Sequence, residues 1–381
     1  MPSQEQGTAP PPTLMAAGVA WPARYELLDG LRGLAAVAVV LQHLGAASTG
    51  HLAVMVFFVI SGYCITASAE SSRRNGDGLW PFMLRRARRI YPPYWLAVTF
   101  YAATRLVKVS IGGRDDLQRP LIEWVRNLTL TQWVSDLFHP VASADANHSL
   151  FVAAFWSLNY EEQFYLVMAL IVVLAAWRRT PPIVPVLILA VLGLAWNWSI
   201  PEGWICGLFI EYWAHFAAGS LLYFALCAYT SRRQRTAFVA LMMALGLACA
   251  ARVALGSGHG ADGMRAMREL AFLSAVTLAL YFLRPASAVI ARSRFWRPIA
   301  ALGTVSYSLY LVHQFNLTVV ASIAARVLPS ATPYALTIAA MITMHLGIGA
   351  AFWYVAERPF LRRPGRAPEP MLASAERQPA A

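Results

Sequence analysis

The sequence predicts an all-α integral membrane protein with about ten transmembrane helices and both termini in the cytoplasm. Its 381 residues are 58% hydrophobic and only 13% charged, which is about half the charged fraction of an ordinary soluble domain. Long apolar runs follow one another along most of the chain. The net charge is +12, but the arginines form short clusters between the apolar runs. That pattern is typical of positive-inside loops, so we expect the lipid bilayer and no nucleic acid as a partner.

Ten segments are apolar enough to be predicted as spans: 31–47, 50–69, 90–108, 160–177, 182–197, 205–227, 236–255, 269–284, 299–326 and 333–355. If the N-terminus is cytoplasmic, most of the 31 basic residues fall in inner loops, which favours an even number of spans. We expect residues 1–27 to be a disordered cytoplasmic tail, 28–360 one membrane domain and 361–381 a second cytoplasmic tail. The expected location is a bacterial cytoplasmic membrane.

The first span, within "LDGLRGLAAVAVVLQHLG" at 28–45, carries two ionisable residues, Arg32 and His43. Eleven steps along a helix return to within about 20° of the starting direction and rise about 16 Å, so both side chains share one stripe. We expect Arg32 near a membrane edge and His43 deep inside, where an ionisable residue marks a functional site. A neutral imidazole can accept a proton. The alternative is a structural histidine bonded to a neighbouring helix carbonyl.

The second span contains "FFVISG" at 57–62, with two small residues in mid-span. Gly62 would allow close approach of another helix. Ser61 could bind a substrate, or only the carbonyl of its own helix.

The segment "LRRARRIYPPYW" at 84–95 places four arginines before the third span: Arg85, Arg86, Arg88 and Arg89. A positive-inside anchor explains some of this charge. Four guanidinium groups so close together exceed what orientation requires, and their fork-shaped donors suit phosphate groups. We therefore expect donor phosphates to bind here, with anchoring alone as the alternative.

The segment "WSLNYEEQFYL" at 156–166 leads into the fourth span. Adjacent residues point about 100° apart on a helix, so Glu161 and Glu162 should face different surroundings. We expect Glu161 to point inward, where it would orient His43 or bind acceptor hydroxyls. Trp156 and Ser157 are candidate substrate contacts.

A later segment, "SYSLYLVHQ" at 306–314, places Ser306, Tyr310 and His313 at i, i+4 and i+7, on one helix face. Such a polar stripe lines a water-filled cavity or forms bonds between helices. Tyr310 and His313 are candidate substrate contacts. The four cysteines all lie in apolar runs and form no CxxC pair, so we expect no metal site.

Taken together, these segments and a closing "ERPF" at 357–360 resemble acyltransferase family 3, the membrane O-acyltransferases, from about residue 28 to 360. The resemblance implies transfer of an acyl group, often acetyl, to a hydroxyl of a carbohydrate or lipid-linked glycan. Some relatives acylate macrolides instead. It also implies that Arg32 and His43 are the essential first-span pair, that the arginine run handles the donor, and that Glu161 is the motif glutamate. The usual motif is closer to "WSLSVEEQFYL", so Asn159 and Tyr160 depart from it.

The predicted mechanism starts with acyl-CoA, whose phosphate groups bind to the arginine run. Acyl-CoA would be a co-substrate and not a tightly bound cofactor. The acyl end would reach His43, which acts as general base on the acceptor hydroxyl or first takes the acyl group. Two other classes stay open. A carrier or flippase of glycans would have similar polar stripes, with pseudo-symmetric halves. A membrane scaffold would have no cavity joining His43 to the arginine run.

Overall fold

In the computed structural model, the described residues are 25–74, 79–110, 118–138, 141–142, 150–199, 204–205, 207–228, 231–256 and 260–361. The helices are α1 (Leu27–His43), α2 (Gly50–Arg74), α3 (Leu79–Ser110), α4 (Leu121–Thr129), α5 (Gln132–Phe138), η1 (Ala153–Phe155), α6 (Trp156–Arg178), α7 (Ile183–Ser199), α8 (Ile210–Tyr223), η2 (Phe224–Ala228), α9 (Arg232–Ala254), α10 (Gly260–Leu283), η3 (Arg284–Ala286), α11 (Ser287–Arg292), α12 (Trp296–Val327), α13 (Tyr334–Phe352), η4 (Trp353–Glu357) and η5 (Arg358–Phe360). Two strands of two residues each, β1 (Val141–Ala142) and β2 (Trp204–Ile205), pair antiparallel. The predicted all-α class is therefore confirmed.

Within the part of the chain that the structure describes, six helical segments are long and apolar enough to cross a membrane: Gly50–Arg73, Ala153–Arg178, Arg232–Ala254, Gly263–Arg292, Trp296–Val327 and Tyr334–Phe360. These segments make the chain a multi-pass membrane protein. The other predicted spans do form helices, but α1 has 17 residues, α8 has 14, and α3 carries the arginine run and two internal prolines. A total of about ten spans and the cytoplasmic placement of both termini stay predictions.

The ends of the chain beyond residues 25 and 361, where tails are expected, lie outside the described residues. Tyr25, the first described residue, is buried and donates a hydrogen bond from its hydroxyl to the Leu280 carbonyl at 2.5 Å. The packed residues therefore include some that precede residue 28.

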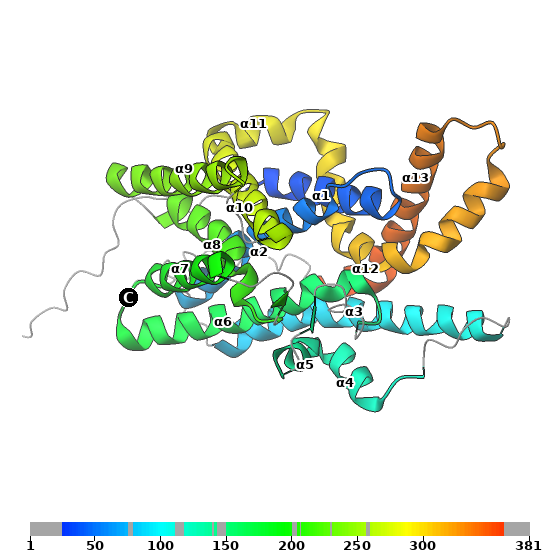
Figure 1. The fold of residues 1–381 in the computed structure, drawn as a ribbon, viewed down its shortest axis with the longest axis horizontal. Helices are drawn as coiled ribbons and strands as arrows, with labels where there is room; N and C mark the ends of the chain where they lie inside the picture. The colour runs from blue at the N-terminus through cyan, green and yellow to red at the C-terminus, as the bar shows by residue number, and fades with distance from the viewer. Residues whose placement is uncertain are drawn as a thin grey trace, which may run out of the picture.

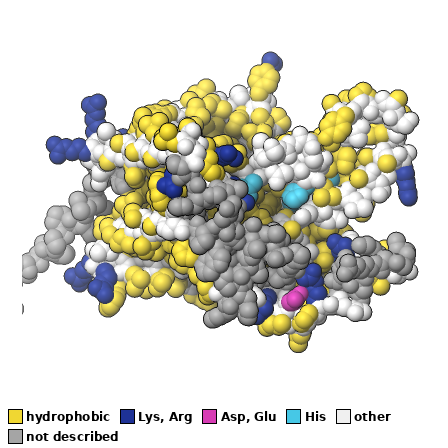
Figure 2. Space-filling model, in the orientation of Figure 1, with side chains coloured by type: hydrophobic (Ala, Val, Ile, Leu, Met, Phe, Trp, Pro, Cys, Tyr) yellow, Lys and Arg dark blue, Asp and Glu magenta, His cyan; other side chains and the backbone are white. Residues whose placement is uncertain are grey.

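The arrangement of the helices is centred on α2, which contacts α1, α6, α8 and α10 (Figure 1). The apolar window of α2 is 67% buried inside the protein, whereas those of α9 and of the α13 segment are only 17% buried. The windows are similarly apolar, so the outer helices expose their apolar side chains, and a bilayer is the environment that would cover them. The space-filling view accordingly shows a largely hydrophobic surface with few acidic side chains (Figure 2).

Two helix crossings depend on glycine. A Cβ on Gly303 of α12 would lie 2.0 Å from the Asp29 carbonyl oxygen of α1, and one on Gly62 of α2 would lie 2.0 Å from the Phe216 oxygen of α8. Gly219 of α8 faces α2 equally closely, since its Cβ would lie 1.9 Å from the Val59 oxygen. Such close backbone contact is open only to glycine. The predicted packing role of Gly62 is confirmed, and these crossings hold α1, α2 and α12 around the site.

Candidate active site

A cavity opens among five helices, with an empty volume of about 740 Å³ that includes space open to solvent. We call it the arginine cavity. It is lined by Arg32 of α1; Phe57, Phe58, Ser61, Cys64 and Ile65 of α2; Arg86, Arg89 and Ile90 of α3; Ser157, Leu158, Glu161 and Tyr165 of α6; and Ser306, Tyr307 and Tyr310 of α12. Each of the motif segments singled out at 28–45, 57–62, 84–95, 156–166 and 306–314 contributes side chains to it.

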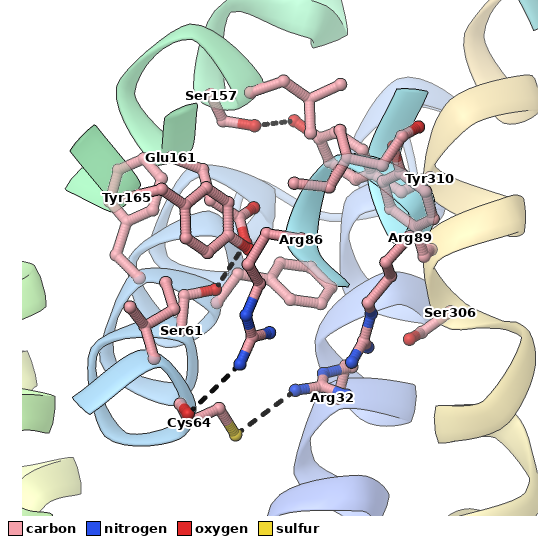
Figure 3. Close-up of a pocket in the computed structure, with 16 residues that line it drawn as sticks. Arg32, Ser61, Cys64, Arg86, Arg89, Ser157, Glu161, Tyr165, Ser306 and Tyr310 are labelled. Carbon is pink, nitrogen blue, oxygen red and sulfur yellow. Dashed lines mark hydrogen bonds between the residues drawn. The ribbon is translucent and has the colours of Figure 1, made fainter. Parts of the chain in front are cut away.

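Three guanidinium groups converge on this cavity (Figure 3). Arg86 and Arg89 are three residues apart on α3, so they share a helix face, and Arg32 reaches in from α1. Arg86 donates to the Cys64 carbonyl at 3.4 Å, and an Nη of Arg32 lies 3.8 Å from the Cys64 sulfur. Among the residues the structure describes, none of the three forms an ion pair within 4.0 Å. Their shared positive charge would suit an anionic ligand.

The other two arginines of the run do not line this cavity. Arg85 donates to the Ser72 hydroxyl of α2, and Arg88 is exposed. Donor binding by all four arginines stays a prediction, and the structure gathers only Arg86 and Arg89 of the run at this cavity. The reason is geometric, because residues one apart on a helix point about 100° apart.

The two carboxylates of the motif separate as expected. Glu161 accepts hydrogen bonds from Ser61 at 3.1 Å and from the Tyr165 hydroxyl at 2.6 Å. Glu162 instead accepts from the Tyr91 hydroxyl. Glu161 thus belongs to the arginine cavity. The expectation that it orients His43 is wrong, because His43 lines a different cavity.

That second cavity, the histidine chamber, has an empty volume of about 490 Å³. Its lining residues are Val39, Gln42, His43, Gly50, His51, Val54, Ala153, Ala154, Trp156 and Tyr310. His43 is the last residue of α1 and its side chain is exposed, and its depth in the membrane stays a prediction. The helix stops there because the chain turns back over residues 44–49 to begin α2.

The boundary between the two cavities is Tyr310, which lines both. Its hydroxyl donates to the Ala154 carbonyl at 2.6 Å and is 2.7 Å from the Ser157 hydroxyl. Ser306 bonds the carbonyl of its own helix at Gly303, at 2.8 Å, and also lines the arginine cavity. The polar stripe of α12 therefore faces a cavity and makes helix bonds as well.

The remaining predicted substrate contacts differ from one another. Trp156 lines the histidine chamber, where it stacks on His51 with ring centroids 5.7 Å apart. His313 is fully buried and lines neither of these two cavities, so its predicted contact with a substrate has no support from the geometry and stays a prediction. Its ring packs 5.0 Å from the ring of His43, and its Nδ1 is 2.8 Å from the Tyr310 carbonyl oxygen.

Three residues of the site were missed by the sequence reasoning. Tyr165 follows Glu161 by one helical turn inside a quoted motif, so its position alone could have indicated it. Glu357, in "ERPF", accepts from Ser308 at 2.7 Å and interacts electrostatically with Arg89 and Arg32. No sequence signal indicates His51, because the turn between α1 and α2 is what brings it to the cavity that His43 lines. Among the described residues, no group of three His, Cys, Asp or Glu side chains could hold a metal.

The family of the chain is established by comparison with family models. The model of an acyltransferase domain, acyltransferase family 3, matches residues 25–354. The chain belongs to acyltransferase family 3. It is 33% identical over 164 residues to O-acetyltransferase OatA of Staphylococcus aureus, covering 40% of this chain and 26% of that protein. It is 32% identical over 176 residues to peptidoglycan O-acetyltransferase OatA of Listeria monocytogenes, covering 44% and 27%.

A third relative is the putative peptidoglycan O-acetyltransferase YrhL of Bacillus subtilis, 31% identical over 156 residues, covering 39% and 24%. The match therefore spans about a quarter of the relatives' own length. No solved structure matches the chain. In this member of acyltransferase family 3, the segments that carry the family resemblance meet at the arginine cavity, and His43 stands in the adjoining chamber.

Proposed function

We propose that this chain is a membrane O-acyltransferase that moves an acyl group, acetyl in the first instance, from acyl-CoA to a hydroxyl of a carbohydrate or glycolipid acceptor. The observation that carries the proposal is the pair of adjoining cavities. One gathers three guanidinium groups without a direct carboxylate partner among the described residues, and the other holds an exposed imidazole. An anionic donor and a proton acceptor are the two elements that acyl transfer from CoA needs.

The donor would bind in the arginine cavity. CoA carries phosphate groups, and the forked donors of Arg32, Arg86 and Arg89 suit them better than a point charge does. The cavity also offers apolar walls, among them Phe57, Phe58 and Ile65, against which the rest of the donor can pack. The acyl end would then pass Tyr310 to reach the histidine chamber.

The reaction would take place in that chamber. His43 is exposed there, and no carboxylate ion pair holds it among the described residues. It acts as general base on the acceptor hydroxyl, or takes the acyl group before the acceptor does. Glu161 has a different role from the one expected, because it stands among the arginines, where it holds Ser61 and Tyr165 in place.

A glycan acceptor is favoured by two relatives, the peptidoglycan O-acetyltransferase OatA of Listeria monocytogenes and the putative peptidoglycan O-acetyltransferase YrhL of Bacillus subtilis. A bacterial cytoplasmic membrane suits this role, since an acyl-CoA donor is cytoplasmic and a surface glycan is not. An intracellular acceptor such as a macrolide is the competing choice.

The test compares surface glycans from a wild-type strain, a deletion strain and the complemented strain by mass spectrometry. Loss of an acyl mass on deletion, restored by the gene, is the expected result. Identical glycans in all three strains would contradict a glycan acceptor, and a missing acyl mass on a small intracellular product would favour the competing choice.

A further inference from the structure

The histidine chamber contains a second imidazole, and a buried carboxylate holds it. His51 Nε2 of α2 lies 2.7 Å from Glu269 Oε1 of α10. Glu269 is only 3% exposed, whereas the side chain of His51 is 30% exposed and lines the chamber that His43 also lines. His51 is therefore fixed at one end and open at the other.

The ring is positioned by several contacts. Its backbone N–H donates to the Gln42 side chain at 3.2 Å, and Gln42 is the neighbour of His43. Gly50 makes the turn tight, since a Cβ there would lie 2.7 Å from the Gln42 Cβ. Trp156 stacks on the ring, with planes 15° apart. The turn over residues 44–49 thus sets the two imidazoles of the chamber in a defined relation.

The carboxylate oxygen 2.7 Å from Nε2 favours a proton on that nitrogen, although the two groups are not aligned as a hydrogen bond. In the neutral ring the lone pair then lies on Nδ1. Nδ1 has no hydrogen-bond partner among the described residues. It is also absent from the buried atoms that lack a partner, so it is exposed to the chamber. In acyl-transfer enzymes generally, a hydroxyl is activated by an imidazole that acts as base through one nitrogen while a carboxylate holds the other.

A purely structural reading treats the pair as a link between α2 and α10. Glu269 also lies 3.6 Å from His215 Nε2 and 3.6 Å from Arg265 Nε, so a link to the rest of α10 and to α8 exists without His51. A buried carboxylate in a membrane protein is costly and commonly marks function. A structural link between helices does not explain why one side of the His51 ring is exposed in the cavity that His43 also lines.

We propose that His51, positioned by Glu269, is a second catalytic residue that accepts the proton of the acceptor hydroxyl, which leaves the acyl group to His43. The inference rests on the proposed function. In the first step a nitrogen of His43 bonds to the acyl carbonyl carbon of acyl-CoA and the bond from that carbon to the CoA sulfur breaks. The departing thiolate takes the proton from the other nitrogen of His43, so CoA leaves as the thiol. In the second step the acceptor O–H bond breaks and its proton passes to Nδ1 of His51, the acceptor oxygen bonds to the acyl carbon, and the bond from that carbon to the His43 nitrogen breaks. The freed His43 ring takes the proton from His51, so both rings return to their neutral form.

The experiment uses membranes from the deletion strain that express wild-type protein or a variant. Radiolabelled acetyl-CoA is the probe, and alkali-labile label in the endogenous glycan fraction is measured. His51→Gln keeps a hydrogen-bonding side chain but cannot serve as a base, so transfer should fall about 100-fold or more. Glu269→Gln should cause a smaller loss. The matched control is His215→Gln, which touches the same carboxylate but lines neither cavity, and its transfer should stay within a few-fold of wild type.

A second readout separates catalysis from folding. Thermal stabilisation of the purified protein by CoA reports the arginine cavity alone, and His51→Gln should keep it. In His51→Ala, added imidazole should restore transfer, because the chamber is open to a small base.

A structural link predicts instead that His51→Gln is nearly as active as wild type, or that imidazole restores nothing to His51→Ala, and either result overturns the role of His51. If wild-type membranes transfer no label, the proposed function itself fails, which is a different outcome from an active wild type with an active His51→Gln.

Discussion

The arginine cavity and the histidine chamber adjoin at Tyr310 but hold their polar groups in different ways. In the arginine cavity, three guanidinium groups face an open volume, and the nearby carboxylate of Glu161 is occupied by Ser61 and Tyr165. In the histidine chamber, one imidazole is held by a carboxylate and the other is not. Three guanidinium groups without a direct carboxylate ion pair among the described residues suit the binding of an anion, whereas a ring with one nitrogen beside a carboxylate suits the transfer of a proton.

The largest expected effect concerns the sides of the membrane on which the two regions open. Ser48, in the exposed turn beside the histidine chamber, and Trp80, which is 74% exposed at the start of the arginine helix α3, are each replaced by cysteine in a background lacking the four native cysteines. A membrane-impermeant thiol reagent on intact cells should label position 48 and leave position 80 unlabelled. Permeabilised cells, in which both should react, are the control. The opposite pattern would place the chamber in the cytoplasm and favour an intracellular acceptor.

Two other positions near the motifs, Asn159 and Asn75, are less suitable for this labelling. Asn159 is only 6% exposed, so a cysteine there would be shielded from a reagent on either side. Position 75 lies outside the described residues.

The next effect concerns the proton chemistry of the chamber. His43→Ala should lower transfer about a hundredfold to ten-thousandfold while the protein stays in the membrane and still binds acyl-CoA, because removal of a base or carrier leaves the donor site intact. Turnover from labelled acetyl-CoA and CoA-dependent thermal stabilisation are the two measurements. Near-normal turnover would exclude both roles of His43.

A smaller effect belongs to the arginine cavity. Arg86→Lys with Arg89→Lys keeps the charge and the topology signal but removes the fork, so acyl-CoA affinity should fall about tenfold to a hundredfold, as expected for one or more lost charge-assisted hydrogen bonds. Calorimetric titration with acyl-CoA measures it. The same run supplies the control, since Arg85→Lys with Arg88→Lys changes the two arginines that do not line the cavity. Equal affinities in the two double variants would make the run an orientation signal only.

The smallest effect is at the boundary. Tyr310→Phe removes the hydroxyl shared with Ala154 and Ser157 but keeps the ring, so transfer should fall only about threefold to tenfold, in line with a neutral hydrogen bond. Tyr307→Phe is the control, because Tyr307 lines only the arginine cavity and bonds the Ile90 carbonyl at 3.0 Å. The two variants should differ in transfer rate and agree in CoA affinity. A change in CoA affinity specific to Tyr310→Phe would mean that the tyrosine belongs to donor binding and not to the boundary.

Local sequence patterns were enough for the fold class and for much of the arginine cavity. Apolar runs of span length predict helices because the bilayer forces backbone groups to pair within a segment. Helical periodicity separates Glu161 from Glu162 and groups Ser157, Glu161 and Tyr165 on one face, and all three line the cavity. Small residues in mid-span predict the close crossing at Gly62.

Only the tertiary structure decided which groups share a cavity. Periodicity within the arginine run permits Arg86 and Arg89, or Arg85 and Arg88, to face inward, and the choice depends on how α3 packs beside α6 and α12. The end of α1 at His43, and with it the exposure of that residue, depends on where the chain turns toward α2. The pairing of His51 with Glu269 joins residues more than two hundred positions apart, a contact that no local pattern encodes because it exists only once α2 and α10 pack together.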